Sequence, residues 1–533
     1  MTHAVLTGCN FIGSRESRDA ARGFRAEDPS TGKALEPSFA EATPGEVDAA
    51  ARAAETAFEA YAVRPPARRA AFLRAIAERL VALGDALLER AQAETALPRP
   101  RLEGERGRTA NQARLFADLV EEGSWVDARI DRAQPDRKPA PKPDLRRMLV
   151  PLGPVAVFGA SNFPLAFSVA GGDTVSALAA GCPVVVKAHP AHPGTSELAG
   201  RAILEAARET GMPDGVFSMV QGQGTDVGQA LVTHPAVQAV GFTGSFRGGK
   251  ALFDAAARRD QPIPVFAEMG SANPVFVLPD ALATRGEEIA KALAASVTLG
   301  CGQFCTNPGL VLVAPADAAG SFVSRLGGLL AGAPAGTMAH AGIKAAYDAA
   351  VVAVAALPGV AVAARSSARE PNAATEAQPA LLLADARAFA AHDRLGEEVY
   401  GPATLAVRCG SKDELLASAR RLHGHLTATL HATERDLLAY PELLPILAHK
   451  AGRLLLNGVP TGVEVTHAMH HGGPWPATTD PRATSVGTAA ILRFARPVSY
   501  QDVPDGALPE ELRGANPRGI WRLVDGRLTK DAL

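Results

Sequence analysis

The chain has 533 residues, of which 47% are hydrophobic and 21% charged, and its formal net charge is −2. This composition is typical of a globular protein with two or more domains, and the near-neutral charge gives no reason to expect nucleic acid or a membrane as partner. Because the five cysteines lack zinc-type spacing, and neither a signal peptide nor a membrane-length apolar run is recognised, we expect a cytoplasmic protein.

Residues 46–124 are predicted to be helical, because apolar side chains recur there at intervals of three and four residues. Residues 129–147 are charged and rich in proline, and we interpret them as an excursion from the core that contributes an edge strand to assembly. From Pro151 to Gly270, short apolar strands alternate with amphipathic helices. This alternation predicts a parallel sheet covered by helices on both faces.

The strand–helix alternation resumes after Gly270 and continues to about Ala451, which predicts a second α/β block. Residues 457–487 are rich in Gly, Pro, Thr and His and are predicted to form a loop that lines a site. Ile491 to Phe494 is predicted to be one more short strand, followed by a polar tail with little core signal. The expected fold class is therefore α/β, with two doubly wound parallel-sheet domains and a small β element.

Three side chains outline a possible catalytic site. Cys305 lies in a glycine-flanked loop that ends at a proline, and Glu268 ends an apolar strand. A thiol nucleophile and a carboxylate that activates water are sufficient for covalent catalysis at a carbonyl carbon. Asn162 directly follows a strand, where its amide could donate to a developing oxyanion. Taken singly, the cysteine would more often have a buried packing role, and the asparagine would more often form a turn.

The first α/β block also offers candidate anion-binding residues. The turn 241–249 follows a strand and opens a helix, where backbone N–H groups and the helix dipole favour a phosphate. Lys187 ends another strand, and ligands of open α/β sheets bind at the carboxyl ends of strands. It could therefore hold ribose hydroxyls or a phosphate, although a solvated surface lysine is an equal alternative.

Six segments resemble, in order, the motifs of the aldehyde dehydrogenase superfamily. They are Asn162-Phe163-Pro164, Lys187, Phe242-Thr243-Gly244-Ser245, Glu268-Met269-Gly270-Ser271, Gly302-Gln303-Phe304-Cys305 and Glu397-Glu398-Val399-Tyr400-Gly401-Pro402. The resemblance covers nearly the whole chain and selects Cys305 over Cys301 as the nucleophile. Ser271 replaces a glycine of the family pattern and Tyr400 a phenylalanine. The resemblance implies NAD(P)-dependent oxidation of an aldehyde to a carboxylic acid through a cysteine thiohemiacetal and thioester.

The resemblance also implies a role for each matching residue. Asn162 and the backbone N–H of Cys305 would stabilise the oxyanion, and Glu268 would activate the water that hydrolyses the thioester. The residues expected to bind the cofactor are Lys187, Ser245, Gly244, Gly249, Glu398 and Tyr400.

The expected cofactor is NADP or NAD. NAD-selective members of the family carry a carboxylate just after the strand-ending lysine, where it repels a 2′-phosphate. Here Pro190 takes that place and the next acidic residue is Glu197, so NADP is favoured. No metal is expected, because the histidine-rich segment 467–471 has no accompanying Glu-x-x-His motif or cysteine pair.

Segments 186–196, 303–309 and 471–479 resemble more narrowly the 2-oxoglutarate semialdehyde (2,5-dioxopentanoate) dehydrogenases, a branch that also resembles NADP-dependent fatty-aldehyde dehydrogenases. A semialdehyde carries a distal carboxylate that needs a cation, and Arg108 and Arg114 are available on a helix that borders the substrate tunnel in the family. A medium- or long-chain fatty aldehyde would instead need an apolar tunnel. The side chains that could partly supply one are Phe163, Phe167 and Trp475.

Other functions stay open at this point: a thiol hydrolase without dinucleotide, a non-catalytic relative, and an acylating dehydrogenase that uses coenzyme A. The intact Cys305, Glu268 and Asn162 argue against a non-catalytic relative, and Glu268 favours hydrolysis over transfer to coenzyme A. The expected partners are a small-molecule aldehyde and further copies of the chain, in a homodimer or homotetramer. The expected domains are a dinucleotide-binding domain (1–128 and 148–269), a catalytic domain (270–456), oligomerisation strands (129–147 and 488–500), and a site-lining loop and C-terminal tail (457–487 and 501–533).

Overall fold

The computed structural model describes residues 6–19, 22–368 and 374–533. Its first large sheet has seven strands in the order β11-β10-β7-β8-β9-β1-β2, of which β7 to β11 run parallel. The strands are β1 (Asn10–Ile12), β2 (Arg15–Ser17), β7 (Val155–Phe158), β8 (Val184–Lys187), β9 (Phe217–Val220), β10 (Ala239–Thr243) and β11 (Val265–Glu268). The five parallel strands are mostly buried, as expected for a sheet covered on both faces.

Helices cover both faces of this sheet, and a hairpin of β3 (Gly23–Asp28) and β4 (Lys33–Ala40) lies near the N-terminus. The helices are α1 (Pro44–Ala62), α2 (Pro66–Ala82), α3 (Gly84–Thr95), α4 (Arg99–Glu122), α5 (Gly172–Ala180), α6 (Pro193–Glu209), α7 (Asp226–Thr233) and α8 (Phe246–Ala257). The helix α5, which follows β7, begins only at Gly172, fourteen residues after the strand ends at Phe158. The backbone N–H groups of Leu165 and Ala166 instead donate to the buried carboxylate of Glu105 on α4, each at 2.9 Å.

The second large sheet has the order β15-β17-β18-β13-β12-β19-β20 and is parallel except for the edge strand β15. Its strands are β12 (Val275–Val277), β13 (Leu310–Val313), β15 (Ala361–Arg365), β17 (Ala380–Asp385), β18 (Ala403–Arg408), β19 (His425–His431) and β20 (Ala451–Leu456). The accompanying elements are α9 (Pro279–Thr298), η2 (Leu299–Gly302), α10 (Ala319–Gly332), β14 (Gly336–Thr337), α11 (Ala341–Ala355), β16 (Glu376–Ala377), α12 (Ala386–Ala391), η3 (Asp393–Gly396), α13 (Lys412–Arg421), α14 (Glu434–Ala439) and α15 (Leu443–Ala448).

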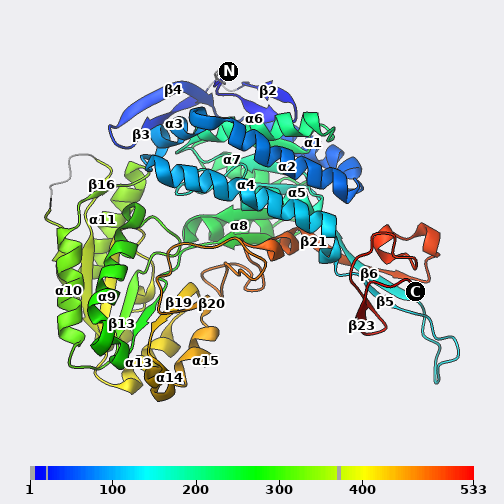
Figure 1. Cartoon of the computed structure of the whole chain (residues 1–533). Helices are drawn as coiled ribbons and strands as arrows, with labels where there is room; N and C mark the ends of the chain where they lie inside the picture. The colour runs from blue at the N-terminus through cyan, green and yellow to red at the C-terminus, as the bar shows by residue number, and fades with distance from the viewer. Residues whose placement is uncertain (1–5, 20–21, 369–373) are drawn as a thin grey trace.

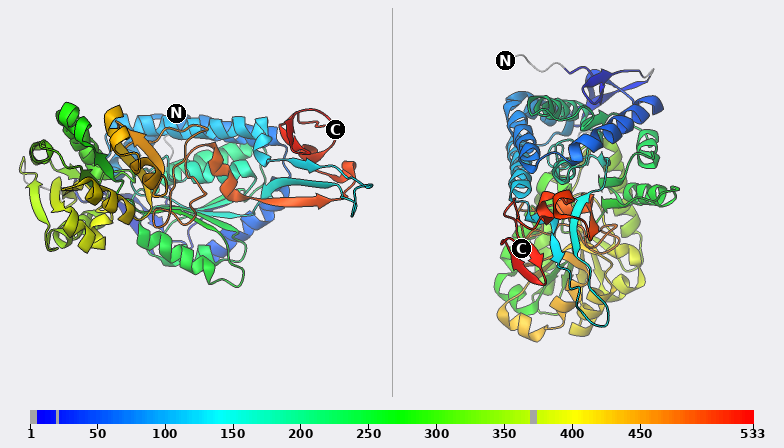
Figure 2. Two further views of the ribbon diagram at one scale, coloured as in Figure 1. Left: turned by 90° about the horizontal axis from the view of Figure 1, so that it is seen from below. Right: turned by 90° about the vertical axis from the view of Figure 1, so that its right-hand side faces the viewer.

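A third, five-stranded sheet with the order β21-β6-β5-β22-β23 projects from the body as an arm (Figures 1 and 2). Its elements are η1 (Ser124–Val126), β5 (Arg129–Asp131), β6 (Leu145–Pro151), β21 (Ala495–Gln501), η5 (Asp505–Ala507), η6 (Glu510–Leu512), β22 (Arg522–Val524) and β23 (Arg527–Thr529). The prediction of a polar tail after residue 500 is therefore wrong. Leu512, Ile520 and Arg522 are buried in the arm, and β22 pairs with β5.

The strand predicted at Ile491 to Phe494 is also wrong, because these residues belong to the 3-10 helix η4 (Thr488–Phe494). Ile491 and Phe494, three residues apart, both turn into the core of the first block, whereas Leu492 is exposed. This helical spacing matches one face of a helix, and the strand that pairs with β6 begins only at Ala495.

The α/β fold class, with two mostly parallel sheets and a small β element, is confirmed. In the part of the chain that the structure describes, no helix is both long and apolar enough to cross a membrane.

Candidate active site

Cys305 lies in the loop that leads from η2 to β13, and its thiol faces two other reactive side chains. Its Sγ atom lies 3.4 Å from Nε2 of His471, and the same nitrogen lies 2.9 Å from Oε1 of Glu268. The sulfur, nitrogen and carboxylate oxygen all lie within 4.8 Å of one another. Burial and the neighbouring Glu268 carboxylate raise the pKa of the Cys305 thiol well above its ordinary value. The resting thiol is therefore protonated, and its activation needs an adjacent proton acceptor.

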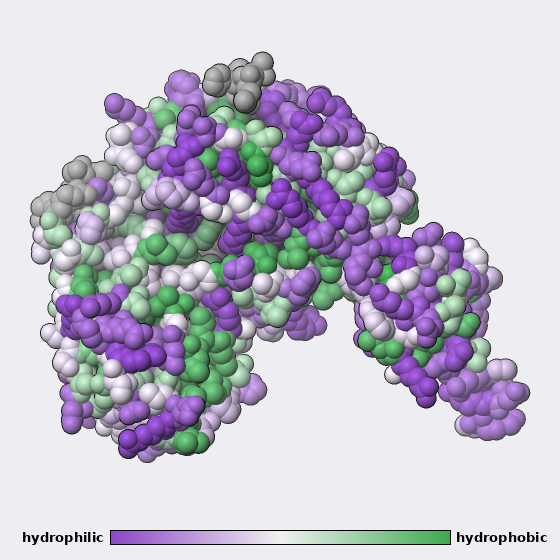
Figure 3. Space-filling view, in the orientation of Figure 1, coloured by the Kyte–Doolittle hydropathy of each residue, from purple (hydrophilic) through white to green (hydrophobic). Residues whose placement is uncertain are grey.

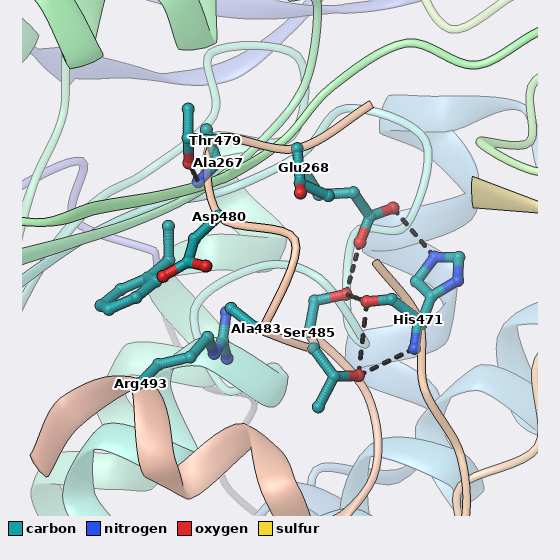
Figure 4. Close-up of a pocket in the computed structure, with 11 residues that line it drawn as sticks. Ala267, Glu268, His471, Thr479, Asp480, Ala483, Ser485 and Arg493 are labelled. Carbon is teal, nitrogen blue, oxygen red and sulfur yellow. Dashed lines mark hydrogen bonds and ion pairs between the residues drawn. The ribbon is translucent and has the colours of Figure 1, made fainter. Parts of the chain in front are cut away.

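Glu268 ends β11 and is almost fully buried. Figure 4 shows its carboxylate between His471 and Ser485, whose hydroxyl donates to Oε2. Burial alone would raise the pKa of Glu268, but the contacts with His471 and Ser485 outweigh it and lower the pKa below its ordinary value. The buried carboxylate is therefore ionised at neutral pH and can accept a proton.

Asn273 holds the cysteine loop in place. Its side-chain amide donates to the backbone carbonyls of Cys305 at 2.8 Å and Asn307 at 2.9 Å. Its own oxygen accepts from the hydroxyls of Ser271 and Thr427. A single buried asparagine thus ties the loop to the segment that follows Glu268, which fixes the nucleophile relative to the carboxylate.

Gly302 lets the loop lie directly against the segment 397–402. It has a φ of +65°, and a Cβ atom there would meet the backbone of Gly401 at 2.2 Å, so only glycine fits. Asn307 adds a hydrogen bond to the Gly401 carbonyl at 3.1 Å.

Cys301 points away from the site. It is buried, and its Sγ lies 3.1 Å from the carbonyl oxygen of Gly336 on β14. Burial raises the pKa of this thiol to about 12. The two cysteines of the loop thus differ in surroundings, and only Cys305 faces the carboxylate and the imidazole.

Asn162 lies beside the cysteine loop. Its side-chain amide donates to the carbonyl of Gln303 at 3.1 Å, and its backbone carbonyl accepts from Arg101 at 2.8 Å. The amide is therefore within two residues of the nucleophile along the loop, and a shift of this one hydrogen bond would free it for a substrate oxygen.

Aromatic and cationic side chains form one wall near Cys305. Phe163 contacts Phe167 and Phe304, with ring centroids 5.4 and 5.5 Å apart. The guanidinium of Arg101 lies over Phe163 and Phe304, and that of Arg108 lies 5.3 Å from the centroid of Phe167.

Arg108 has unused hydrogen-bonding capacity. Its Nε and Nη2 atoms are buried and have no hydrogen-bond partner among the residues that the structure describes. Burial lowers its pKa, although Glu105 and the charges of Cys305 and Glu268 act in the opposite direction. Two buried, unpaired donors near a reactive thiol mark a place where an anionic group would be held.

Two residues proposed for the substrate tunnel lie elsewhere. Arg114 is exposed on α4 and donates to Asn111 at 3.0 Å, so it does not join Arg108. Trp475 is 46% exposed and packs against Phe246 and Phe253 of α8. These contacts place Trp475 on the first block, not beside Phe163 and Phe167.

Two of the residues expected to bind the cofactor lie at the ends of elements in the first block. Lys187 ends β8, and its ammonium donates to the carbonyl of Gly222 at 2.6 Å. Burial lowers the pKa of Lys187 to about 8, an effect that the Glu41 carboxylate partly opposes. Ser245 caps α8, and its hydroxyl accepts from the N–H of Gly248 at 3.2 Å.

The glycines of this turn differ in their surroundings. Gly244 is exposed, as is Ser245, which leaves the start of α8 open to an anion. Gly249 is buried, and a Cβ atom there would meet Met269 at 2.7 Å. A glycine at position 249 is therefore explained by the close packing of α8 on the segment after Glu268.

Glu398 and Tyr400 lie near Cys305. A side chain at Gly270 would collide with the Glu398 carboxyl group, so glycine leaves room for it. Burial raises the pKa of Glu398 to about 8, against a hydrogen bond from the backbone of Ser271. Burial and the charges of Glu398 and Cys305 also raise the pKa of Tyr400 well above its ordinary value.

The sequence patterns assigned no role to His471, Ser485, Arg101 or Asn273. His471 and Ser485 lie in the loop 457–487, which is predicted to line a site, and His471 also stands in the segments 467–471 and 471–479. Arg101 precedes Arg108 by seven residues, a helical spacing that places both on one face of α4. Asn273 follows Glu268 by five residues, but its contacts across the fold are invisible in sequence.

The sequence matches one protein-family model and is similar to enzymes of known function. Residues 15–473 match the model of the Aldehyde dehydrogenase family. The chain is 55% identical to alpha-ketoglutaric semialdehyde dehydrogenase 2 of Azospirillum brasilense over 523 residues, covering 98% of this chain and 99% of the relative. It is 49% identical to alpha-ketoglutaric semialdehyde dehydrogenase of Acinetobacter baylyi over 494 residues, covering 92% of this chain and 93% of the relative.

Solved structures share the fold. Betaine aldehyde dehydrogenase of Staphylococcus aureus, solved in complex with NAD+, matches with a TM-score of 0.79 and 19% identity, covering 94% of this chain and 95% of the other. At this identity the match shows the fold alone.

Proposed function

The chain belongs to the aldehyde dehydrogenase family, and we propose that it oxidises 2-oxoglutarate semialdehyde to 2-oxoglutarate. The observation that supports this substrate concerns Arg108, whose buried, unpaired nitrogen donors lie near Cys305. An aldehyde with a carboxylate at its far end would pair with this guanidinium while its carbonyl meets the thiol. Both relatives of high identity are named alpha-ketoglutaric semialdehyde dehydrogenases, which supports the same substrate.

The first half of the reaction is acylation of Cys305. The thiol proton passes to the adjacent Glu268–His471 pair as sulfur bonds to the aldehyde carbon. The carbonyl oxygen becomes an oxyanion, which the Asn162 amide and the Cys305 backbone N–H stabilise. A bound nicotinamide dinucleotide supplies the acceptor for the hydride that leaves this carbon. The product on the enzyme is a thioester.

The second half is hydrolysis. Once the thiol proton has passed from the Glu268–His471 pair to solvent, Glu268 takes a proton from a water molecule whose oxygen bonds to the thioester carbon. The carbon–sulfur bond then breaks, the sulfur leaves as the thiolate, and the carboxylic acid is released. Ser485 and His471 hold the Glu268 carboxylate in position for this step.

The residues present fit a dinucleotide. Lys187 at the end of β8 and the open N-terminus of α8 at Ser245 suit the ribose and pyrophosphate, and Glu398 suits the nicotinamide ribose. Accordingly, we assign the first sheet and its helices to the dinucleotide and the block that carries Cys305 to catalysis.

NADP is proposed to be used at least as well as NAD, because no carboxylate follows Lys187 in the segment that holds Pro190. Glu197 lies on α6 and accepts from Gly8 at 2.9 Å, so it faces the N-terminal segment. A carboxylate from another element, Glu41, does accept from the N–H of Gln223 at 2.9 Å and influences Lys187. It limits the discrimination that we expect between the two cofactors.

We also propose a homodimer or homotetramer in which the arm supplies the contacts. The arm projects from the body, and in the family such strands pair across subunits. β20 ends the second sheet as an edge strand and carries exposed Leu454 and Leu456. Figure 3 shows hydrophobic colour on the side of this block that faces the arm. Edge strands with exposed apolar side chains are usually covered in the assembled state.

The decisive experiment is a steady-state screen of semialdehydes and straight-chain aldehydes with NADP and NAD. We expect the highest kcat/KM for the five-carbon 2-oxo semialdehyde. The wall of Phe163, Phe167 and Phe304 also suits an apolar chain, so medium and long fatty aldehydes are the main competing substrates. If these gave the highest kcat/KM, the substrate assignment would be wrong while the chemistry at Cys305 would stand.

A further inference from the structure

We propose that Cys305, His471 and Glu268 form a reversible Zn²⁺ site, so that zinc ion occupies and inhibits the resting enzyme. Thiolate, imidazole and carboxylate are the three protein ligand types that zinc uses. The inhibition rests on the proposed function, because it requires Cys305 to be the nucleophile. The binding of the metal does not rest on that function and can be measured by itself.

The geometry of the three groups suits one ion. In a tetrahedral zinc site with bonds of about 2.0–2.3 Å, the ligand atoms lie about 3.3–3.6 Å apart. Here the sulfur and Nε2 of His471 lie 3.4 Å apart, Nε2 and the Glu268 oxygen lie 2.9 Å apart, and all three atoms lie within 4.8 Å of one another. Small side-chain rotations would bring them around a shared centre.

Hydrogen bonds from neighbouring residues also fix the orientation of the three ligand side chains. The Ser485 hydroxyl donates to the second oxygen of Glu268, and the backbone N–H of His471 donates to Thr484 at 2.8 Å. Asn273 fixes the carbonyl of Cys305. Such supporting contacts orient metal ligands before the metal arrives and thereby raise affinity. Glu268 and His471 are 3% and 1% exposed, so little water competes for them.

The chemistry of binding is a simple exchange. The Cys305 thiol releases its proton to solvent, a zinc–sulfur bond forms, and no electrons are transferred. Three protein ligands leave a fourth position for water, as in open zinc sites. The sulfur lone pair that would attack an aldehyde is then engaged by the metal, and the Glu268 carboxylate is no longer free to activate water.

Nearby cations limit the affinity. Arg108 and Arg453 both interact electrostatically with Cys305, and their positive charges disfavour a further cation. The thiolate and carboxylate together carry two negative charges, which offset the charge of the ion. We therefore expect binding weaker than at structural zinc sites and fully reversed by a chelator.

The test uses the full-length enzyme, free of thiol reductant and chelator, with Co²⁺ as a spectroscopic probe. Cobalt bound to a thiolate gives a charge-transfer band in the near ultraviolet and visible bands of tetrahedral intensity. We expect these bands in the wild type and in Cys301→Ala, whose thiol lies on Gly336. Cys305→Ser should lose the charge-transfer band, and His471→Gln should weaken cobalt binding at least about tenfold.

The activity arm adds Zn²⁺ to the wild type and to Cys301→Ala. Both should lose aldehyde oxidation in parallel with displacement of bound cobalt, and both should recover with a chelator. A charge-transfer band that persists in Cys305→Ser, or zinc inhibition without displacement of cobalt, would overturn the inference. Failure of the proposed function looks different, since metal-free enzyme would then oxidise no aldehyde while the cobalt bands remained.

Discussion

Cys301 in η2 and Cys305 in the loop that follows are expected to differ in their importance for catalysis. Cys305→Ala is expected to abolish aldehyde oxidation, because Cys305 alone faces Glu268 and His471. Cys301→Ala is expected to keep most of it, because its sulfur packs on Gly336 of β14. Steady-state assays of both variants measure this. An active Cys305→Ala enzyme would disprove the nucleophile assignment.

Glu268→Gln separates the two halves of the reaction. The amide keeps the shape of the side chain but cannot take a proton from water. His471 remains beside Cys305 to accept the thiol proton, so hydride transfer should continue while thioester hydrolysis slows by roughly 10²–10⁴-fold. Stopped-flow absorbance should then show a burst of reduced cofactor followed by slow turnover. Turnover within about threefold of the wild type would contradict the role of Glu268 as base.

Lys187 gives the enzyme a pH dependence at the adenosine end. Because burial lowers its pKa to about 8, the ammonium that we propose to bind a 2′-phosphate is present below this pH and is lost above it. The KM for NADP should therefore rise between about pH 7 and pH 9, with a smaller change for NAD and little change in kcat. Lys187→Met should raise the KM and remove the pH dependence. A flat wild-type profile would show that bound phosphate keeps the lysine charged.

Sequence alone predicted the residues whose neighbours are local. Cys305, Glu268 and Asn162 stand in short motifs, and the structure brings all three to one region. His471 could not be recognised this way, because it meets Glu268 and Cys305 across separations of 203 and 166 residues. The sequence predicts no metal role for its segment, because no Glu-x-x-His motif or cysteine pair accompanies it, whereas the fold brings Glu268 and Cys305 beside His471.

At the level of single elements, we expect the two faces of α4 that carry Arg108 and Arg114 to differ in function. Arg108 and Arg114 are six residues apart, so they point to different sides of the helix. Arg108→Gln should lower kcat/KM for the semialdehyde by about 10- to 100-fold, the loss expected for a hydrogen bond to a charged group of roughly 1.5–3 kcal/mol. The same variant should change kcat/KM for an uncharged aldehyde of equal length by less than about threefold.

Arg114→Gln is the matched control, since its side chain is exposed and contacts Asn111. It should leave both substrates unaffected. Equal losses for charged and uncharged aldehydes in Arg108→Gln would indicate a packing defect at Phe167 instead of lost carboxylate binding.

The elements themselves were predictable where one periodicity dominates. The buried strands β7 to β12 are short apolar runs, and the sequence pattern locates them to within a few residues. The pattern predicts a strand at Ile491 to Phe494, whereas these residues end a 3-10 helix that continues directly into the strand β21. Ile491 and Phe494 face a core formed by residues distant in sequence, and tertiary packing decided their conformation.

At the scale of the whole molecule, the arm predicts assembly. Light scattering should give two or four times the chain mass of 55.1 kDa. Leu456→Asp, on the exposed edge strand β20, should shift the mass toward the monomer, because a charge would be buried in the contact. Val63→Asp, at a residue that is 79% exposed after α1, is the control and should not. A wild-type monomer at micromolar concentration would refute the assembly.

The cysteine loop is held by groups from several distant segments: Asn273 after β11, Gly401 before β18, and Asn162 after β7. The first two contacts lie within the second α/β block, whereas the contact of Asn162 with Gln303 exists only when both blocks have formed and docked. Recovery of catalytic activity therefore measures the docking of the two α/β blocks, which we expect to be the last step of folding. During refolding from denaturant, helical circular dichroism should return first, and aldehyde oxidation should follow with a lag.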